Sequence, residues 1–366
     1  MGMRRGFWVA AISTTVFLCL RYDTGYDWPD YKMVYEATPS FLNMISEGVF
    51  TYSNMFQKEP LFLLLISVLK LISHDYQLLI AVISIIEVYC FSIFLRRFSL
   101  DQTFVFAATI SWLLFTLYMS TLRQGLAVSM FFLFFIAYFE RRWVAATVWG
   151  ILAVMFQYSA IGYFVLFFAS FYLRSTRLTK SVFLLCWLLA IGGLDLSRQF
   201  LSLFLNIGIS FIDAKLAYYL YELNQEVNAF DRIYAIFYPI LIYLVVFHFD
   251  EQDESELDPA IRVIRGLSLA YLFIMVFFLE FPLIRNRLQY LVLPMNYLLL
   301  IHAFSNKGRF IKAVFFSGML AVHLVYFALF LGKQSSAPFV PFQSYLTHIV
   351  TGEPGDGEQR YESILP

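Results

Sequence analysis

Three arginines lie where the sequence otherwise carries few charges. Arg123 sits between two apolar runs, beside the small residues Gly125 and Ala127, and Arg285 and Arg287 lie between two other long apolar runs. A guanidinium group stays charged and presents a planar fork that matches phosphate oxygens. If the three side chains converge, they could bind a diphosphate without a metal ion. The alternative is that they are interface anchors whose charged ends reach for water.

A second group combines carboxylates with aromatic rings. Asp27 and Asp30 lie in a short stretch rich in aromatic residues that includes Tyr31, and Glu59 precedes Pro60 at the start of an apolar run. Aromatic rings stack on the apolar faces of sugars, and a carboxylate could take a proton from a hydroxyl group. The three carboxylates are therefore candidate catalytic bases. The alternatives are a solvated acidic turn for the aspartates and a helix N-terminal charge for Glu59.

Gln157 interrupts two short apolar runs, and we expect it on the same side as Arg123. Its amide could bind a substrate hydroxyl, or it could satisfy the backbone of a broken helix. The five histidines are scattered, and the three cysteines all lie inside apolar runs. No metal-binding, nucleotide-binding or nucleophile motif is present in the sequence. We therefore expect no metal site and no cofactor.

The composition places these residues in a membrane. Of the 366 residues, 60% are hydrophobic, 20% are aromatic and only 14% are charged, whereas a soluble domain is about 45–50% apolar and about 25% charged. Too few charges are available to cover a soluble globule, and a disordered chain would need low hydrophobicity. The net charge of zero argues against a nucleic-acid partner, which would leave a basic excess. The sequence therefore predicts a multi-pass integral membrane protein in contact with lipid.

About 11–12 apolar segments follow one another along the chain, and several are shorter than the ~20 residues of a full span. Short helices survive at membrane depth only when they are buried in protein or line a cavity. We therefore expect an all-α protein with short and re-entrant helices around an external cavity. Residues 1–331 would form a single polytopic membrane domain with external loops 21–59 and 195–232, and 332–366 an irregular tail without chemistry. We also expect the polar stretch 284–287 to be an external loop, and the helical spacing of apolar residues over 199–223 predicts a helix lying in the membrane interface.

The basic loops leave one topological conflict. Short loops rich in Lys and Arg mark the cytoplasmic side, but if Arg4 and Arg5 are inside and 60–73 crosses the membrane, the later basic loops fall outside. Either 60–73 is a re-entrant element that does not cross, or the N-terminus is outside. The shortness of 60–73 and its start at Glu59-Pro60 favour the first solution.

Taken in order, these motifs resemble those of the EpsG family, the Wzy-type polymerases of O-antigen and exopolysaccharide. The motifs that carry the resemblance are Gly25…Asp30-Tyr31…Tyr35 with Glu59-Pro60, Arg123-Gln124-Gly125-Leu126-Ala127, Phe156-Gln157-Tyr158-Ser159-Ala160 and Arg285…Tyr290. They cover most of residues 20–300. Gln157 departs from the pattern, because the family usually has histidine at this position.

The resemblance implies a fold similar to the GT-C superfamily and a glycosyltransferase in the bacterial inner membrane, with its active site facing the periplasm. Its substrates would be undecaprenyl-diphosphate-linked glycans, and a chain-length regulator would be a further partner. On this hypothesis Asp27, Asp30 and Glu59 are the candidate catalytic carboxylates. Arg123, Arg285 and Arg287 would bind the diphosphate, and Tyr31, Gln124, Gln157 and Tyr290 the rest of the substrate. The alternatives are a flippase of lipid-linked oligosaccharides and an O-antigen ligase.

Overall fold

The described part of the protein is helical. The computed structural model describes residues 2–46, 59–173, 176–192, 196–203, 217, 229–244, 257–305 and 307–364. Within these ranges the chain forms helices and turns, and the one β-type pairing is an isolated antiparallel bridge between Arg21 and Ser344. The predicted all-α membrane class is confirmed.

Among the described residues, four helices are long and apolar enough to cross a membrane. They are α5 (Tyr76–Phe98), α7 (Leu122–Phe139), α14 (Pro259–Phe277) and α16 (Arg309–Leu331). Shorter apolar helices accompany them: α1 (Gly2–Cys19), α4 (Pro60–Leu69), α6 (Gln102–Leu113) with a π-helical turn at Leu114–Tyr118, α8 (Trp143–Phe156), α9 (Ile161–Ser170) and α10 (Arg177–Ile191). Most residues of these helices are apolar, as expected where lipid or protein surrounds a helix.

Helix α4 forms the first part of segment 60–73, whose crossing of the membrane was in question. It has ten residues and is therefore about 15 Å long at ~1.5 Å per residue. This is about half the ~30 Å thickness of the hydrocarbon core. Helix α4 is therefore too short to cross alone, and the re-entrant course remains our prediction.

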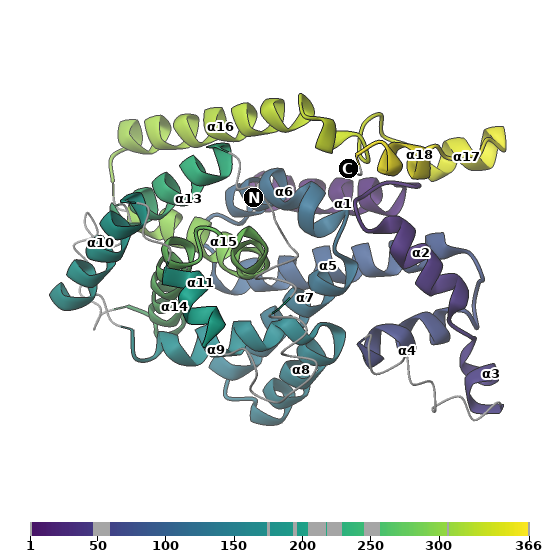
Figure 1. Ribbon diagram of the computed structural model, residues 1–366, viewed down its shortest axis with the longest axis horizontal. Coiled ribbons are helices and arrows are strands. Elements are labelled where there is room, and N and C mark those ends of the chain that lie inside the picture. The colour runs from purple at the N-terminus through teal and green to yellow at the C-terminus, as the bar shows by residue number, and fades with distance from the viewer. Residues whose placement is uncertain are drawn as a thin grey trace. The chain divides into compact units, whose positions relative to one another are not determined.

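The chain divides into two compact units, which are described separately. The first comprises residues 1–161 and 304–366. In it α7 packs against α5 and α8, and α1 packs against α5 and α6, as Figure 1 shows. Aromatic rings fill the interface between α5 and α7, where Phe94 stacks on Phe132 with ring centres 4.5 Å apart. This packing fixes the start of α7, where Arg123 lies.

The second unit comprises residues 162–303. In it α10 and α13 (Ala229–Ile242) pack on each other and on α14, and the Trp187 indole N–H donates to the carbonyl of Ile236 over 2.8 Å. Helix α15 (Pro282–Phe304) begins at a proline, a residue well suited to the first turn of a helix. The stretch 284–287, which we expected to be an external loop, is therefore the first part of a helix.

The two predicted external loops are described to different extents. The first contains α2 (Trp28–Ala37) and α3 (Phe41–Ser46), and the helix breaks before Pro39 because a proline disfavours helical geometry in the residue before it. The second contains α11 (Leu196–Ser202) and the start of α13. The helix that we expected over 199–223 falls largely on residues outside the described ranges.

The C-terminal segment 333–364 lies against the loop that links α1 to α2. It contains α17 (Tyr345–Thr351) and α18 (Gly357–Glu362), whereas the sequence suggested an irregular tail. The backbone N–H of Tyr22 donates to the carbonyl of Gln343 over 2.9 Å, and that of Tyr345 donates to the carbonyl of Leu20 over 2.8 Å. These contacts place the C-terminal segment beside the α1–α2 loop.

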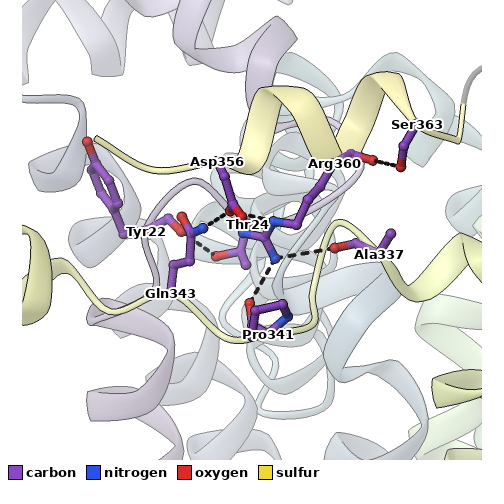
Figure 2. A network of polar contacts seen from close by, with 8 residues as sticks. All are labelled: Tyr22, Thr24, Ala337, Pro341, Gln343, Asp356, Arg360 and Ser363. Carbon is purple, nitrogen blue, oxygen red and sulfur yellow. Dashed lines mark hydrogen bonds and ion pairs between the residues drawn. The ribbon is translucent and has the colours of Figure 1, made fainter. Parts of the chain in front are cut away.

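Figure 2 shows the polar network that holds this segment in shape. The Nε of Arg360 lies 2.7 Å from Oδ1 of Asp356, and its Nη1 donates to the carbonyl of Pro341 over 2.8 Å. The side-chain amide of Gln343 also donates to Asp356. The C-terminal segment is therefore tied together around a single guanidinium group.

Gly25 gives a test of the loop between α1 and α2. Its φ is 122°, and a Cβ there would collide with the carbonyl oxygen of Met119. We expect Gly25→Ala to lower the free energy of unfolding by about 1–3 kcal/mol, measured as a lower midpoint of thermal unfolding in detergent. Gly318 on α16 is the matched control, because it has open space around it and alanine favours a helix by about 0.5–1 kcal/mol. Equal midpoints for the two variants would contradict this account.

Candidate active site

A partly buried ion pair joins Glu59 to Arg123. The Nη1 of Arg123 donates to Oε2 of Glu59. The Glu59 side chain is 8% exposed and that of Arg123 is 31% exposed, so the pair lies at the edge of the packed interior. One face of Arg123 is therefore held by protein while another remains open to a ligand.

Tyr31 completes this cluster from α2. The guanidinium carbon of Arg123 lies 5.5 Å from the centre of the Tyr31 ring, within the range of a cation–π interaction. Burial raises the pKa of the Tyr31 hydroxyl to about 12, although the positive charge of Arg123 opposes this shift. At neutral pH Tyr31 thus keeps its proton and can donate a hydrogen bond.

Glu59 and Arg123 both lie at the start of a helix. Glu59 directly precedes Pro60, the first residue of α4, and Arg123 is the second residue of α7. The N-terminus of a helix carries partial positive charge, which disfavours a cation and favours an anion. Arg123 is therefore unfavourable for α7 on its own, and the carboxylate of Glu59 offsets that cost. The position of Arg123 at a helix N-terminus therefore indicates a role other than stabilising α7.

Behind this cluster lies a second buried pair of opposite charges. Arg21 is 2% exposed and Glu87, on α5, is 1% exposed. Nη1 of Arg21 donates to the carbonyl of Tyr118, whereas its Nε and Nη2 and both Glu87 oxygens have no hydrogen-bond partner among the described residues. Burial lowers the pKa of Arg21, and the negative charge of Glu87 opposes that shift.

Gly125 connects the two charge pairs. A Cβ at this position would overlap Oε1 of Glu87, so a glycine is required for α7 to approach the carboxylate. The sequence analysis noted Gly125 as a small residue beside Arg123, and the structure shows that the group approaching it is a buried carboxylate. Glu87 therefore lies against α7 two residues after Arg123.

The three candidate bases lie in different environments. Glu59 is buried and paired with Arg123, whereas Asp27 is half-buried at the start of α2 and acts on Tyr31 electrostatically. Asp30 is exposed in the first turn of α2, a position that suits a helix-terminal negative charge. Of the two aspartates, Asp27 is the better placed to contact a group bound at Tyr31.

The glutamines lie on the same part of the first unit. Gln124 follows Arg123 in α7 and is 4% exposed, and its Oε1 accepts a hydrogen bond from Ser159 over 3.0 Å. Gln157 is half-buried at the break between α8 and the 3-10 turn Tyr158–Ala160. The backbone of Gln157 already bonds to Ala153 and Ala160. The motif around Gln157 is thus tied to the helix that carries Arg123.

The remaining candidates belong to the second unit. Arg285 on α15 is 2% exposed, and its Nε and Nη1 are buried without a hydrogen-bond partner in the part of the chain that the structure describes. Arg287 and Tyr290 are half-buried on the same helix, and the carbonyl of Arg287 accepts from the Tyr163 hydroxyl over 3.1 Å. The convergence of these arginines with Arg123 stays a prediction.

Sequence reasoning missed Arg21 and the C-terminal segment as parts of this region. Arg21 ends the first apolar run, and a charge at that point is also what an ordinary membrane anchor would show. Within the described ranges, no group of three or more His, Cys, Asp or Glu side chains is arranged to hold a metal ion. A metal-free reaction remains a prediction.

A double-mutant cycle tests the energetic role of the ion pair. Glu59→Gln leaves Arg123 without its counter-charge, and we expect the free energy of unfolding to fall by about 1–3 kcal/mol, less than for a fully buried pair because Arg123 is partly exposed. The measurement is unfolding in mixed micelles with increasing denaturing detergent. Adding Arg123→Gln should recover part of the loss. Strictly additive effects of the two substitutions would show that the pair contributes nothing.

Comparison with known proteins agrees with the motifs. No curated protein and no solved structure matches this chain. Residues 6–344, nearly the whole chain, match the EpsG family. This range contains the partly buried ion pair, α2 and the arginines of α15. The chain therefore belongs to the EpsG family, whose members are Wzy-type polysaccharide polymerases.

Proposed function

We propose that this protein joins undecaprenyl-diphosphate-linked repeat units on the periplasmic face of the bacterial inner membrane, extending an O-antigen or exopolysaccharide chain. The donor is a glycan chain on its lipid diphosphate, and the acceptor is a single repeat unit on the same lipid. Family membership supports a polymerase. The observation that carries the detailed proposal is the partly open Arg123 guanidinium held by Glu59 beside Tyr31.

The chemistry needs a group that stabilises the leaving diphosphate. The bond between the anomeric carbon and the diphosphate oxygen breaks, and a bond from the acceptor hydroxyl oxygen forms. Negative charge grows on the leaving diphosphate, so that preorganised cations aimed at it accelerate the reaction. Arg123 has this character, because its charge is fixed and its orientation is set by Glu59.

Arg285 supports the same role from the second unit. Its buried guanidinium has Nε and Nη1 without partners among the described residues. A planar guanidinium edge suits two phosphate oxygens. In this proposal Arg123, Arg285 and Arg287 bind the diphosphate together without a metal, while Gln124, Gln157 and Tyr290 contact the rest of the substrate.

The acceptor hydroxyl must also lose a proton. Glu59 is engaged with Arg123, so we assign Glu59 to positioning that arginine. Asp27 lies beside Tyr31 and is half-buried, so we assign it as the base that takes the proton. In this proposal the Tyr31 hydroxyl, on α2, donates a hydrogen bond to the substrate.

The first test replaces the arginines in a strain that lacks its own polymerase. We expect Arg123→Ala and Arg285→Ala each to reduce the rate of chain growth by roughly 10²–10³, the effect of removing one contact to transition-state charge. Polymer length is measured on gels, with membrane levels of each variant measured in parallel. The matched control is Arg97→Ala, since Arg97 is 52% exposed and only loosely paired with Glu140. Long polymers from normally expressed Arg123→Ala and Arg285→Ala proteins would refute the assignment.

The second test separates the two aspartates. Asp27→Asn should reduce chain growth by about 10²-fold or more, because a general base contributes about 10²–10⁴-fold. Asp30→Asn, in the same turn of helix, should leave chain growth close to that of the unmodified protein because Asp30 is exposed. The measurement is the initial rate with purified lipid-linked repeat units. The opposite order of effects would move the base to Asp30.

The same purified system distinguishes the alternative functions. Growth of the glycan chain indicates a polymerase. Movement of the lipid-linked saccharide across vesicles without growth would indicate a flippase, and transfer to the lipid A core would indicate a ligase.

A further inference from the structure

A cavity of about 310 Å³ lies in the first unit, beside α2. Its volume is near the lower end of the ~300–1,000 Å³ found for small-molecule sites. Trp28, Lys32 and Tyr35 line it from α2, and their spacing of four and three residues places them on one face of the helix. Tyr31, on the same helix, contacts Arg123. The cavity therefore adjoins the candidate active site.

Three residues that line this cavity carry buried polar groups without partners in the described ranges. These groups are the Nε and Nη2 of Arg21, the indole Nε1 of Trp28 and the hydroxyl of Tyr76, none of which has a hydrogen-bond partner among the described residues. Buried donors normally have partners. Nε and Nη2 of an arginine form one edge of the guanidinium, which suits two oxygens of a ligand at once. These groups together favour a ligand rich in oxygen atoms.

The other walls supply acceptors and flat rings. The carboxylates of Asp23, Glu36 and Asp75 line the same cavity as the cations Arg21 and Lys32, so that acidic groups slightly outnumber basic ones. A hydroxyl group can donate to a carboxylate and accept from a guanidinium or an indole N–H. The small acidic excess disfavours an anionic ligand. Alternating donors and acceptors beside aromatic rings are the chemistry that recognises a saccharide.

The C-terminal segment closes one side of the cavity. Tyr345 and His348 of α17 line it, and both lie beyond residue 344, where the match to the family ends. The His348 ring stacks on Tyr22 with centres 4.3 Å apart, and the Tyr345 hydroxyl donates to Asp75. The network in Figure 2 holds the preceding and following residues in place. This wall is therefore built from residues outside the family match.

We infer that the cavity binds a sugar residue of the lipid-linked saccharide and holds it next to Arg123 and Tyr31. The inference rests on the proposed function for the identity of the saccharide. It does not depend on which carboxylate is the base. In this inference the indole N–H of Trp28 and the hydroxyl of Tyr76 donate hydrogen bonds to the sugar. Each group can be removed by a single substitution to phenylalanine.

The test measures binding to the full-length protein in lipid nanodiscs. The probe is the repeat-unit oligosaccharide released by mild acid from the lipid-linked precursor of the same bacterium, and affinity is measured by calorimetry. Trp28→Phe removes the indole N–H, and Tyr76→Phe removes only a hydroxyl. Neither substitution breaks a hydrogen bond within the described residues. We expect each to weaken binding about threefold to tenfold, the range for loss of one neutral hydrogen bond.

The matched controls are Trp143→Phe and Tyr89→Phe, because those side chains are 57% and 61% exposed. Their affinity should equal that of the unmodified protein, and circular dichroism should show the same helical content in all four variants. Failure of the unmodified protein to bind the oligosaccharide, or equal affinity in the Trp28 and Tyr76 variants, would overturn the inference. Saccharide binding that shows the expected losses in a protein unable to extend chains would uphold this site and refute the proposed reaction.

Discussion

The ion pair between Glu59 and Arg123 is the interaction on which this region of the protein depends. It links α4 to α7 across 64 positions of sequence, and it places a cation at a helix N-terminus, where the backbone dipoles disfavour one. An arginine held by one carboxylate at the edge of a packed interior keeps its charge while part of its surface stays available. That combination suits a leaving diphosphate better than it suits a structural role alone.

A second layer of polar residues supports this pair from behind. Glu87 reaches α7 through the space left by Gly125, and Arg21 lies near enough for their charges to interact. Neither group has its full set of hydrogen bonds within the described ranges, and buried polar networks of this kind are usually satisfied. Helix α2 contributes to both the ion-pair cluster and the cavity, because Tyr31 contacts Arg123 and Trp28 lines the cavity.

The sequence predicted the helical membrane class, because composition and apolar runs alone determine it, and it identified Glu59, Tyr31 and Arg123 individually. It could not show that these three touch, since their contact depends on how α2, α4 and α7 pack. The helical start of 284–287 was missed because charged residues there resemble a loop, although Pro282 was a signal for a helix. The C-terminal helices were missed because prolines and glycines suggested irregular structure, and only tertiary contacts with 20–25 order them.

The central claim is that Arg123 binds the diphosphate of the lipid-linked substrate. It is tested most directly by titrating undecaprenyl diphosphate, the product that carries the diphosphate but no sugar, into the protein in nanodiscs. The account predicts that Arg123→Gln weakens this binding by on the order of tenfold, as expected for loss of a charge-assisted contact, while Arg97→Gln leaves it unchanged. Equal affinity in the unmodified protein and the Arg123→Gln variant would contradict the claim.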